Sequence, residues 1–306
     1  MAETAAAGRL NLITMFDYRY HALSLAAVLL ALAVGVLIGV AIGDSNLVSS
    51  AKNGVVRDLS SEVNGANRQA AQLRAQLSSE EAVGNDLSEI AVHGLLNGRR
   101  IGLVFLGGSS DQIDGLVRDA VTQAGGNLVT VAAVHEPLDL GGLAHEALGT
   151  PYAALGAQPG LVRHFGVRIA RQLVGGDHRL LARVQGKLLS SFDGQLEGLE
   201  GLVVVRGEPE GMTPEEARVT GEFEAALIEG TTTARVPTVG VELSSTNPSQ
   251  ITWYKSRDIS SVDDLDLLAG RVALAFTLAG AHGAYGEKST AESGLLPRVA
   301  GGTSLP

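Results

Sequence analysis

The spacing of apolar residues divides the chain into three parts, and the first part is a long uncharged run. Residues 22–42 read ALSLAAVLLALAVGVLIGVAI, which is 21 residues without a charge. A helix rises about 1.5 Å per residue, so this run is just long enough to cross a hydrocarbon core of about 30 Å. The pattern predicts a transmembrane helix over 22–43, preceded by an N-terminal tail over 1–21.

A cleaved signal peptide is the alternative interpretation of this run. Ala41 and Gly43 satisfy a small-x-small cleavage site, and Arg9 and Arg19 place positive charge before the apolar stretch. The apolar region of a signal peptide is usually about 7–15 residues long, which is shorter than the run in this chain. The length therefore favours a retained anchor.

Small residues recur at every fourth position of the predicted anchor. The stripe comprises Ala27, Ala31, Gly35, Gly39 and Gly43. Small residues let two membrane helices approach closely, and close packing drives helix association in lipid. We expect Gly35, Gly39 and Gly43 to form part of a dimer contact. The alternative is that Gly and Ala are simply common in membrane helices.

The second part of the chain, 45–97, has the heptad periodicity of a coiled coil. Apolar residues alternate three and four apart along one seam, and the residues between them are mostly polar. The pattern predicts a stalk that joins two copies as a parallel homodimer, although one long helix folded back on the head would show similar spacing. The oligomerisation residues on this seam are Val56, Leu59, Val63, Leu73 and Leu77.

The third part, 99–297, alternates short apolar runs with amphipathic stretches and is followed by a predicted flexible tail over 298–306. This alternation is typical of an α/β domain in three layers with a mostly parallel sheet. Strands are expected at Ile101–Leu106, Leu128–Val134, Leu202–Val205, Val236–Val241 and Val272–Leu278. Helices are expected at Asp111–Ala124, Leu140–Leu148, Gly160–Leu173, His178–Leu189 and Thr213–Ile228, and Ser260–Leu267 resembles a further helix start.

Charge and composition restrict the partners. The net charge of −10, without a cluster of Lys or Arg, argues against nucleic acid. A chain without cysteine is compatible with an oxidising compartment. Because a first apolar segment after a short tail commonly acts as a signal anchor, we expect a single-pass protein of the cell membrane with its large C-terminal domain outside the cytoplasm. The lipid bilayer and an envelope protein are the further expected partners.

Candidate chemistry is sparse. The turn Gly107-Gly108-Ser109-Ser110 follows a predicted strand, where backbone N–H groups can hold phosphate, but it lacks the Lys of a P-loop, and Ser110 or Asp111 serves more simply as a helix cap. The sequence contains no Gly-x-Ser-x-Gly motif, and we predict neither an enzyme nor a resident cofactor.

Side chains of the types that bind copper are also few. The chain has no Cys and only three Met, so a tight Cu(I) site within one chain is not expected. Weak Cu(II) binding through His and carboxylate side chains stays open. The pairs His135-Glu136 and His145-Glu146 are ten residues apart and could converge, although histidines in helical loops are usually ordinary surface groups.

Both ends of the chain resemble the actinobacterial copper transporter family MctB. The resemblance rests on Phe16-Asp17-Tyr18-Arg19-Tyr20-His21 leading into the anchor, and on SSVDDLDLLAGRVALAFTLAGAHGAYGEKSTAESGLLP near the end. It implies a role in copper efflux or homeostasis at the cell envelope, and members have been described as channel-forming. Related members are associated with cell separation, acting with a membrane partner that controls peptidoglycan hydrolases.

Two hypotheses follow from these observations. The resemblance implies a copper-homeostasis protein of the membrane. The order of anchor, stalk and head fits a dimeric scaffold or regulator of cell separation without a copper site. The first predicts metal binding, and the second predicts loss of function when the seam over Val56–Leu77 is broken.

Overall fold

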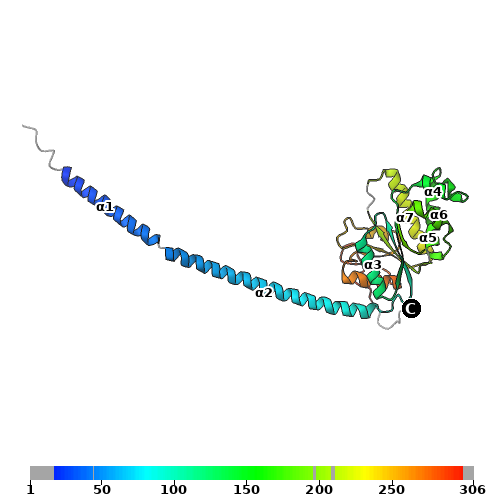
Figure 1. Ribbon diagram of the computed structural model, residues 1–306, viewed down its shortest axis with the longest axis horizontal. Coiled ribbons are helices and arrows are strands. Elements are labelled where there is room, and N and C mark those ends of the chain that lie inside the picture. The colour runs from blue at the N-terminus through cyan, green and yellow to red at the C-terminus, as the bar shows by residue number, and fades with distance from the viewer. Residues whose placement is uncertain (1–16, 44, 196–197, 208–210, 299–306) are drawn as a thin grey trace, which may run out of the picture. The chain divides into compact units, whose positions relative to one another are not determined.

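The computed structural model describes residues 17–43, 45–195, 198–207 and 211–298 (Figure 1). The chain divides into two compact units, one up to Ser78 and one from Ser79. Most of the predicted tails, at 1–16 and 299–306, lie outside the described residues.

Among the described residues, two helices form the first unit. Helix α1 (Asp17–Ile42) contains a stretch, Tyr18–Ile42, that is long and apolar enough to cross a membrane, with a mean hydropathy of 2.9 over an 18-residue window. Helix α2 (Ser45–Val92) has 48 residues and extends into the second unit. The predicted N-terminal apolar helix is therefore confirmed, while the pairing of α2 with a second copy stays a prediction.

The second unit is an α/β domain built on one mostly parallel sheet. Among the described residues, seven strands form it in the order β3-β2-β1-β4-β5-β6-β7, and only β3 is antiparallel to its neighbour. The strands are β1 (Arg100–Leu106), β2 (Asn127–Val134), β3 (Leu189–Gly194), β4 (Gly201–Arg206), β5 (Thr238–Val241), β6 (Ser260–Val262) and β7 (Ala284–Tyr285).

Helices cover both faces of the sheet, which gives the three predicted layers (Figure 1). Side chains alternate along β1: Val104 packs on one face, while Leu103 and Phe105 pack on the other. The Val104 face carries α4 (Leu140–Glu146), α5 (Val162–Gly175), α6 (Arg179–Leu188), α7 (Pro214–Thr233) and α8 (Ile251–Lys255). The Phe105 face carries α3 (Asp111–Gln123), α9 (Leu268–Ala279) and the end of α2.

Local sequence signals set several of these boundaries. Helix α7 begins with a capping box in which Thr213 accepts from the N–H of Glu216 and the Glu216 carboxylate accepts from the N–H of Thr213, with Pro214 at the first position. Two short 3₁₀ segments, Pro151–Ala154 and Pro159–Leu161, precede α5. The six strands and helices expected between Ile101 and Val134 and between Leu202 and Val241 are all confirmed.

Two predictions near the C-terminus are wrong. Val272–Leu278, expected as a strand, lies in helix α9, because an apolar run rich in Ala and Leu also suits a helix that is buried on most sides. Ser260–Leu267, expected to begin a helix, starts with strand β6 and turns at Asp263 and Asp264. The Asp263 carboxylate binds backbone N–H groups of a distant segment there, so it does not cap a helix.

Candidate functional site

A cavity lies at the carboxyl ends of β1, β2 and β4. Strand β1 lies between β2 and β4 in the sheet. The chain continues from β1 to β2 on one side and later adds β4 on the other side, so the direction in which strands are added reverses here. In open α/β sheets ligands bind in the crevice outside such a reversal. The cavity has a volume of about 390 Å³ and is lined among others by Gly107, His135, Glu136, Ser190 and Met212.

The glycine turn after β1 forms one wall of this cavity. Gly107 has a φ of +104°, and a Cβ atom there would lie 3.1 Å from Oε2 of Glu136, so the glycine lets this carboxyl group approach the backbone. Ser110 caps α3 by accepting from the N–H of Ile113 at 3.4 Å. The simpler expectation for Ser110, a helix cap, is confirmed.

Glu136 forms a buried pair with Glu224 of α7. Burial, and then the negative charge of Glu224, raise the pKa of Glu136 to about 8. Oε1 of Glu136 and Oε1 of Glu224 are both buried without a hydrogen-bond partner among the described residues. Because two adjacent carboxyl groups do not both ionise readily, the pair retains a proton at neutral pH.

Arg206, at the end of β4, compensates the remaining charge of this pair. Its Nε lies 3.0 Å from Oε2 of Glu224, which is fully buried, and its Nη1 donates to Gln250 at 2.5 Å. The guanidinium carbon also lies 4.8 Å from the centroid of the Trp253 ring. The backbone N–H of Arg206 donates to the hydroxyl of Tyr254, whose pKa is raised by burial.

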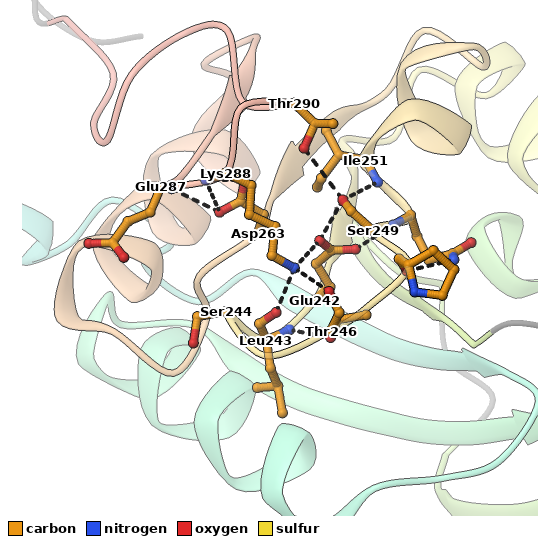
Figure 2. Close-up of polar contacts among 12 residues, drawn as sticks. Glu242, Leu243, Ser244, Thr246, Ser249, Ile251, Asp263, Glu287, Lys288 and Thr290 are labelled. Carbon is orange, nitrogen blue, oxygen red and sulfur yellow. Dashed lines mark hydrogen bonds and ion pairs between the residues drawn. The ribbon is translucent and has the colours of Figure 1, made fainter.

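A second polar cluster follows at the ends of β5, β6 and β7 (Figure 2). The ammonium group of Lys288 lies 2.6 Å from Oε1 of Glu242 and also donates to the carbonyl oxygens of Leu243 and Thr246. The Glu242 carboxylate, 2% exposed, accepts further bonds from the Ser249 hydroxyl and the Gln250 N–H. These contacts fix the segment after β7 onto the edge of the sheet.

Asp263 and Asp264, directly after β6, have different surroundings. Asp263 accepts from the N–H groups of Glu287 and Lys288, which oppose the increase in its pKa caused by burial. Asp264 is fully buried, and neither of its carboxyl oxygens has a hydrogen-bond partner among the described residues. Burial, and then the charge of Asp263, raise the pKa of Asp264 to about 6.

The structure separates the two histidine pairs considered for copper. His135-Glu136 follows β2 and lines the cavity, whereas His145-Glu146 lies in α4. Within the described parts of the chain, no group of three or more His, Cys, Asp or Glu side chains is placed to hold a metal ion. Met212 is the one methionine among the described residues, and it lines the same cavity as His135.

The residues predicted for oligomerisation lie on the two long helices. Gly35 and Gly39 of α1 have open space where a Cβ would stand, and Gly43 follows the last turn. The seam residues of α2 share one face and are all about half exposed: Val56, Leu59, Val63, Leu73 and Leu77. Their role in a dimer stays a prediction.

Comparison with known proteins gives the family. A family model described as copper transport outer membrane protein, MctB, matches residues 15–296, which include α1, α2 and almost all of the α/β domain. The chain belongs to the MctB family. Proteins named copper transporter MctB from Mycobacterium tuberculosis and Mycobacterium bovis are 32% identical to it over 120 residues. This match covers 39% of the chain and 38% of the length of those relatives.

Sequence reasoning considered Glu136 only beside His135, and it missed that this MctB-family domain gathers charged residues at one edge of its sheet. Arg206 is the last residue of β4, and Glu136, Glu242 and Asp263 each follow the end of a strand by no more than two residues. The signal was therefore present as a charged residue at the end of each strand. It could be used only once the strands were known to be parallel, since their carboxyl ends then meet at one edge.

Proposed function

We propose that this protein is a membrane-anchored MctB-type protein of copper transport or homeostasis at the cell envelope. The observation that carries the proposal is the family match over 15–296, which covers the apolar helix, the long helix and the head together. The relatives bear the name copper transporter, which is not the name of an enzyme family. Copper is the cargo in this proposal, and no resident cofactor is required.

The proposed topology places α1 across the cell membrane, with the N-terminus inside and the α/β head outside the cytoplasm. The length and hydropathy of Tyr18–Ile42 support the anchor. The absence of cysteine is compatible with the oxidising side of a membrane. The proposed active form is a parallel homodimer joined through the seam of α2.

Copper tolerance of a deletion strain tests this function. The strain should be more sensitive to copper and should accumulate more of it, and the full-length chain should restore both properties. Zinc tolerance is the matched control, since loss of the envelope barrier in general would change both metals together. Unchanged copper tolerance and copper content would contradict the proposal.

A second candidate function is a dimeric scaffold that binds a membrane partner and regulates peptidoglycan hydrolysis during cell separation. The observation that favours it is the α2 seam, since an exposed apolar stripe marks an interaction surface. It predicts chained cells when Leu59 and Leu73 are both replaced by Glu, with copper tolerance unchanged. Normal cell separation in that strain would rule the scaffold out.

A further inference from the structure

We propose that the cavity at the ends of β1, β2 and β4 is a copper site, with the imidazole of His135 and the thioether of Met212 as ligands and the carboxyl group of Glu136 beside them. This inference rests on the proposed copper function and assigns that function a place in the head. The three side chains come from the loops after two different strands.

The chemistry of the lining supports copper over other cations. Thioether sulfur is a soft ligand that selects Cu(I), imidazole suits both oxidation states, and carboxylate suits harder cations. Met212 supplies the soft ligand, and it shares this cavity with an imidazole and a carboxyl group. A site for Mg²⁺ or Ca²⁺ would instead use oxygen ligands throughout.

The fold holds these groups without burying them completely. The backbone N–H of His135 donates to the carbonyl of Leu188 at 2.8 Å, which fixes the backbone while the side chain stays exposed. Glu136 is held by its contact with Glu224 and by the glycine turn. The site is therefore reached from solvent on one side and supported by the sheet on the other.

The same cavity is poorly suited to an anion. The N-terminus of α3 is nearby, but its first turn carries Asp111 and Asp114, whose charges oppose phosphate. Ser110 already caps this helix. The glycine turn thus contributes space for the cavity, and a phosphate cradle is disfavoured.

The test is copper binding by the full-length chain purified in detergent. Cu(I) affinity is measured against a chromophoric competitor, and Cu(II) is followed by electron paramagnetic resonance. Met212→Leu should weaken Cu(I) at least tenfold and change Cu(II) little, because only the soft ligand is lost. His135→Ala should weaken both ions at least tenfold.

Matched variants separate this site from other ligands of the chain. His145→Ala removes an exposed imidazole that also precedes a glutamate, and Met15→Leu removes a thioether outside the described residues. Both should bind copper as the wild type does. Equal binding by His135→Ala, Met212→Leu and the wild type would overturn the site. The deletion strain tests the function separately, since copper sensitivity can persist when this cavity fails to bind.

Discussion

At the scale of single residues, the molecule concentrates buried charge at the carboxyl edge of its sheet. Burying a charge is costly unless it is paired or neutralised. Lys288 pairs with Glu242, whereas Asp264 has no hydrogen-bond partner among the described residues and its pKa is raised by burial. We therefore expect stability to respond differently to a substitution of Lys288 and to a substitution of Asp264, and only the second response should depend on pH.

Asp264→Asn should change how stability depends on pH. The pKa of Asp264 is raised from 3.8 to about 6 in the folded chain, so the stability it contributes is complete below pH 4 and is lost as the pH rises through 6. The amide does not titrate, so the variant should gain stability relative to the wild type between pH 4 and pH 7, on the order of 3 kcal/mol. Urea unfolding across this range measures the difference.

The exposed Asp119→Asn provides the control for that measurement, because it removes one carboxyl charge without removing a buried group. Its stability relative to the wild type should be nearly constant over the same pH range. Parallel pH profiles for Asp264→Asn and the wild type would show that Asp264 does not titrate in this range.

Lys288→Met should destabilise the domain by about 3 kcal/mol, because it leaves the Glu242 carboxylate buried without its countercharge. Adding Glu242→Gln should recover part of that loss. Lys255→Met breaks the more exposed pair with Glu292 and should cost less than about 1 kcal/mol. Equal losses of unfolding free energy for the two lysine variants in chemical denaturation would contradict the difference in burial between the two ion pairs.

At the scale of elements, close packing of α9 against the turn after β6 depends on a glycine. A Cβ at Gly270 would collide with the backbone carbonyl of Asp264. The first turn of α9 lies directly against the acidic turn.

Gly270→Ala should therefore destabilise the domain by about 1–3 kcal/mol through overpacking, although alanine favours a helix. Gly221→Ala, in α7, is the matched control, since nothing lies within 4 Å of the position its Cβ would take. That variant should stabilise by about 0.5–1 kcal/mol through helix propensity. Thermal unfolding of both variants checks that their changes in stability have opposite signs. Stabilisation by Gly270→Ala would contradict the close packing.

At the scale of the whole molecule, assembly is expected to depend on the seam of α2. Leu59→Glu combined with Leu73→Glu should convert a dimer to a monomer, because each leucine that the dimer would bury contributes about 1.5–3 kcal/mol and the charges repel across the seam. Light scattering of the detergent-purified chain measures the mass. Ser61→Glu combined with Gln72→Glu adds the same charge away from the seam and should leave a dimer. A monomeric wild type would exclude the seam as an interface.

The sequence by itself determined the features that depend on local pattern. The apolar helix, the long second helix and most strands of the α/β head follow from runs and periods of apolar residues, and Ser110 and Thr213 mark helix starts through their own side chains. The family resemblance was also readable from the two ends of the chain. The edge strand β3 was missed because LSSFDG has no apolar run.

Only the tertiary structure decided which residues meet. Glu136 and Glu224 lie 88 positions apart in the sequence but form one buried pair, and Glu242 meets Lys288 only because the segment after β7 returns to the sheet. The cavity exists because β1 lies between β2 and β4, an order that no local pattern encodes. Periodicity reports which face of an element is buried, whereas a site depends on strand order and on the contacts that follow from it.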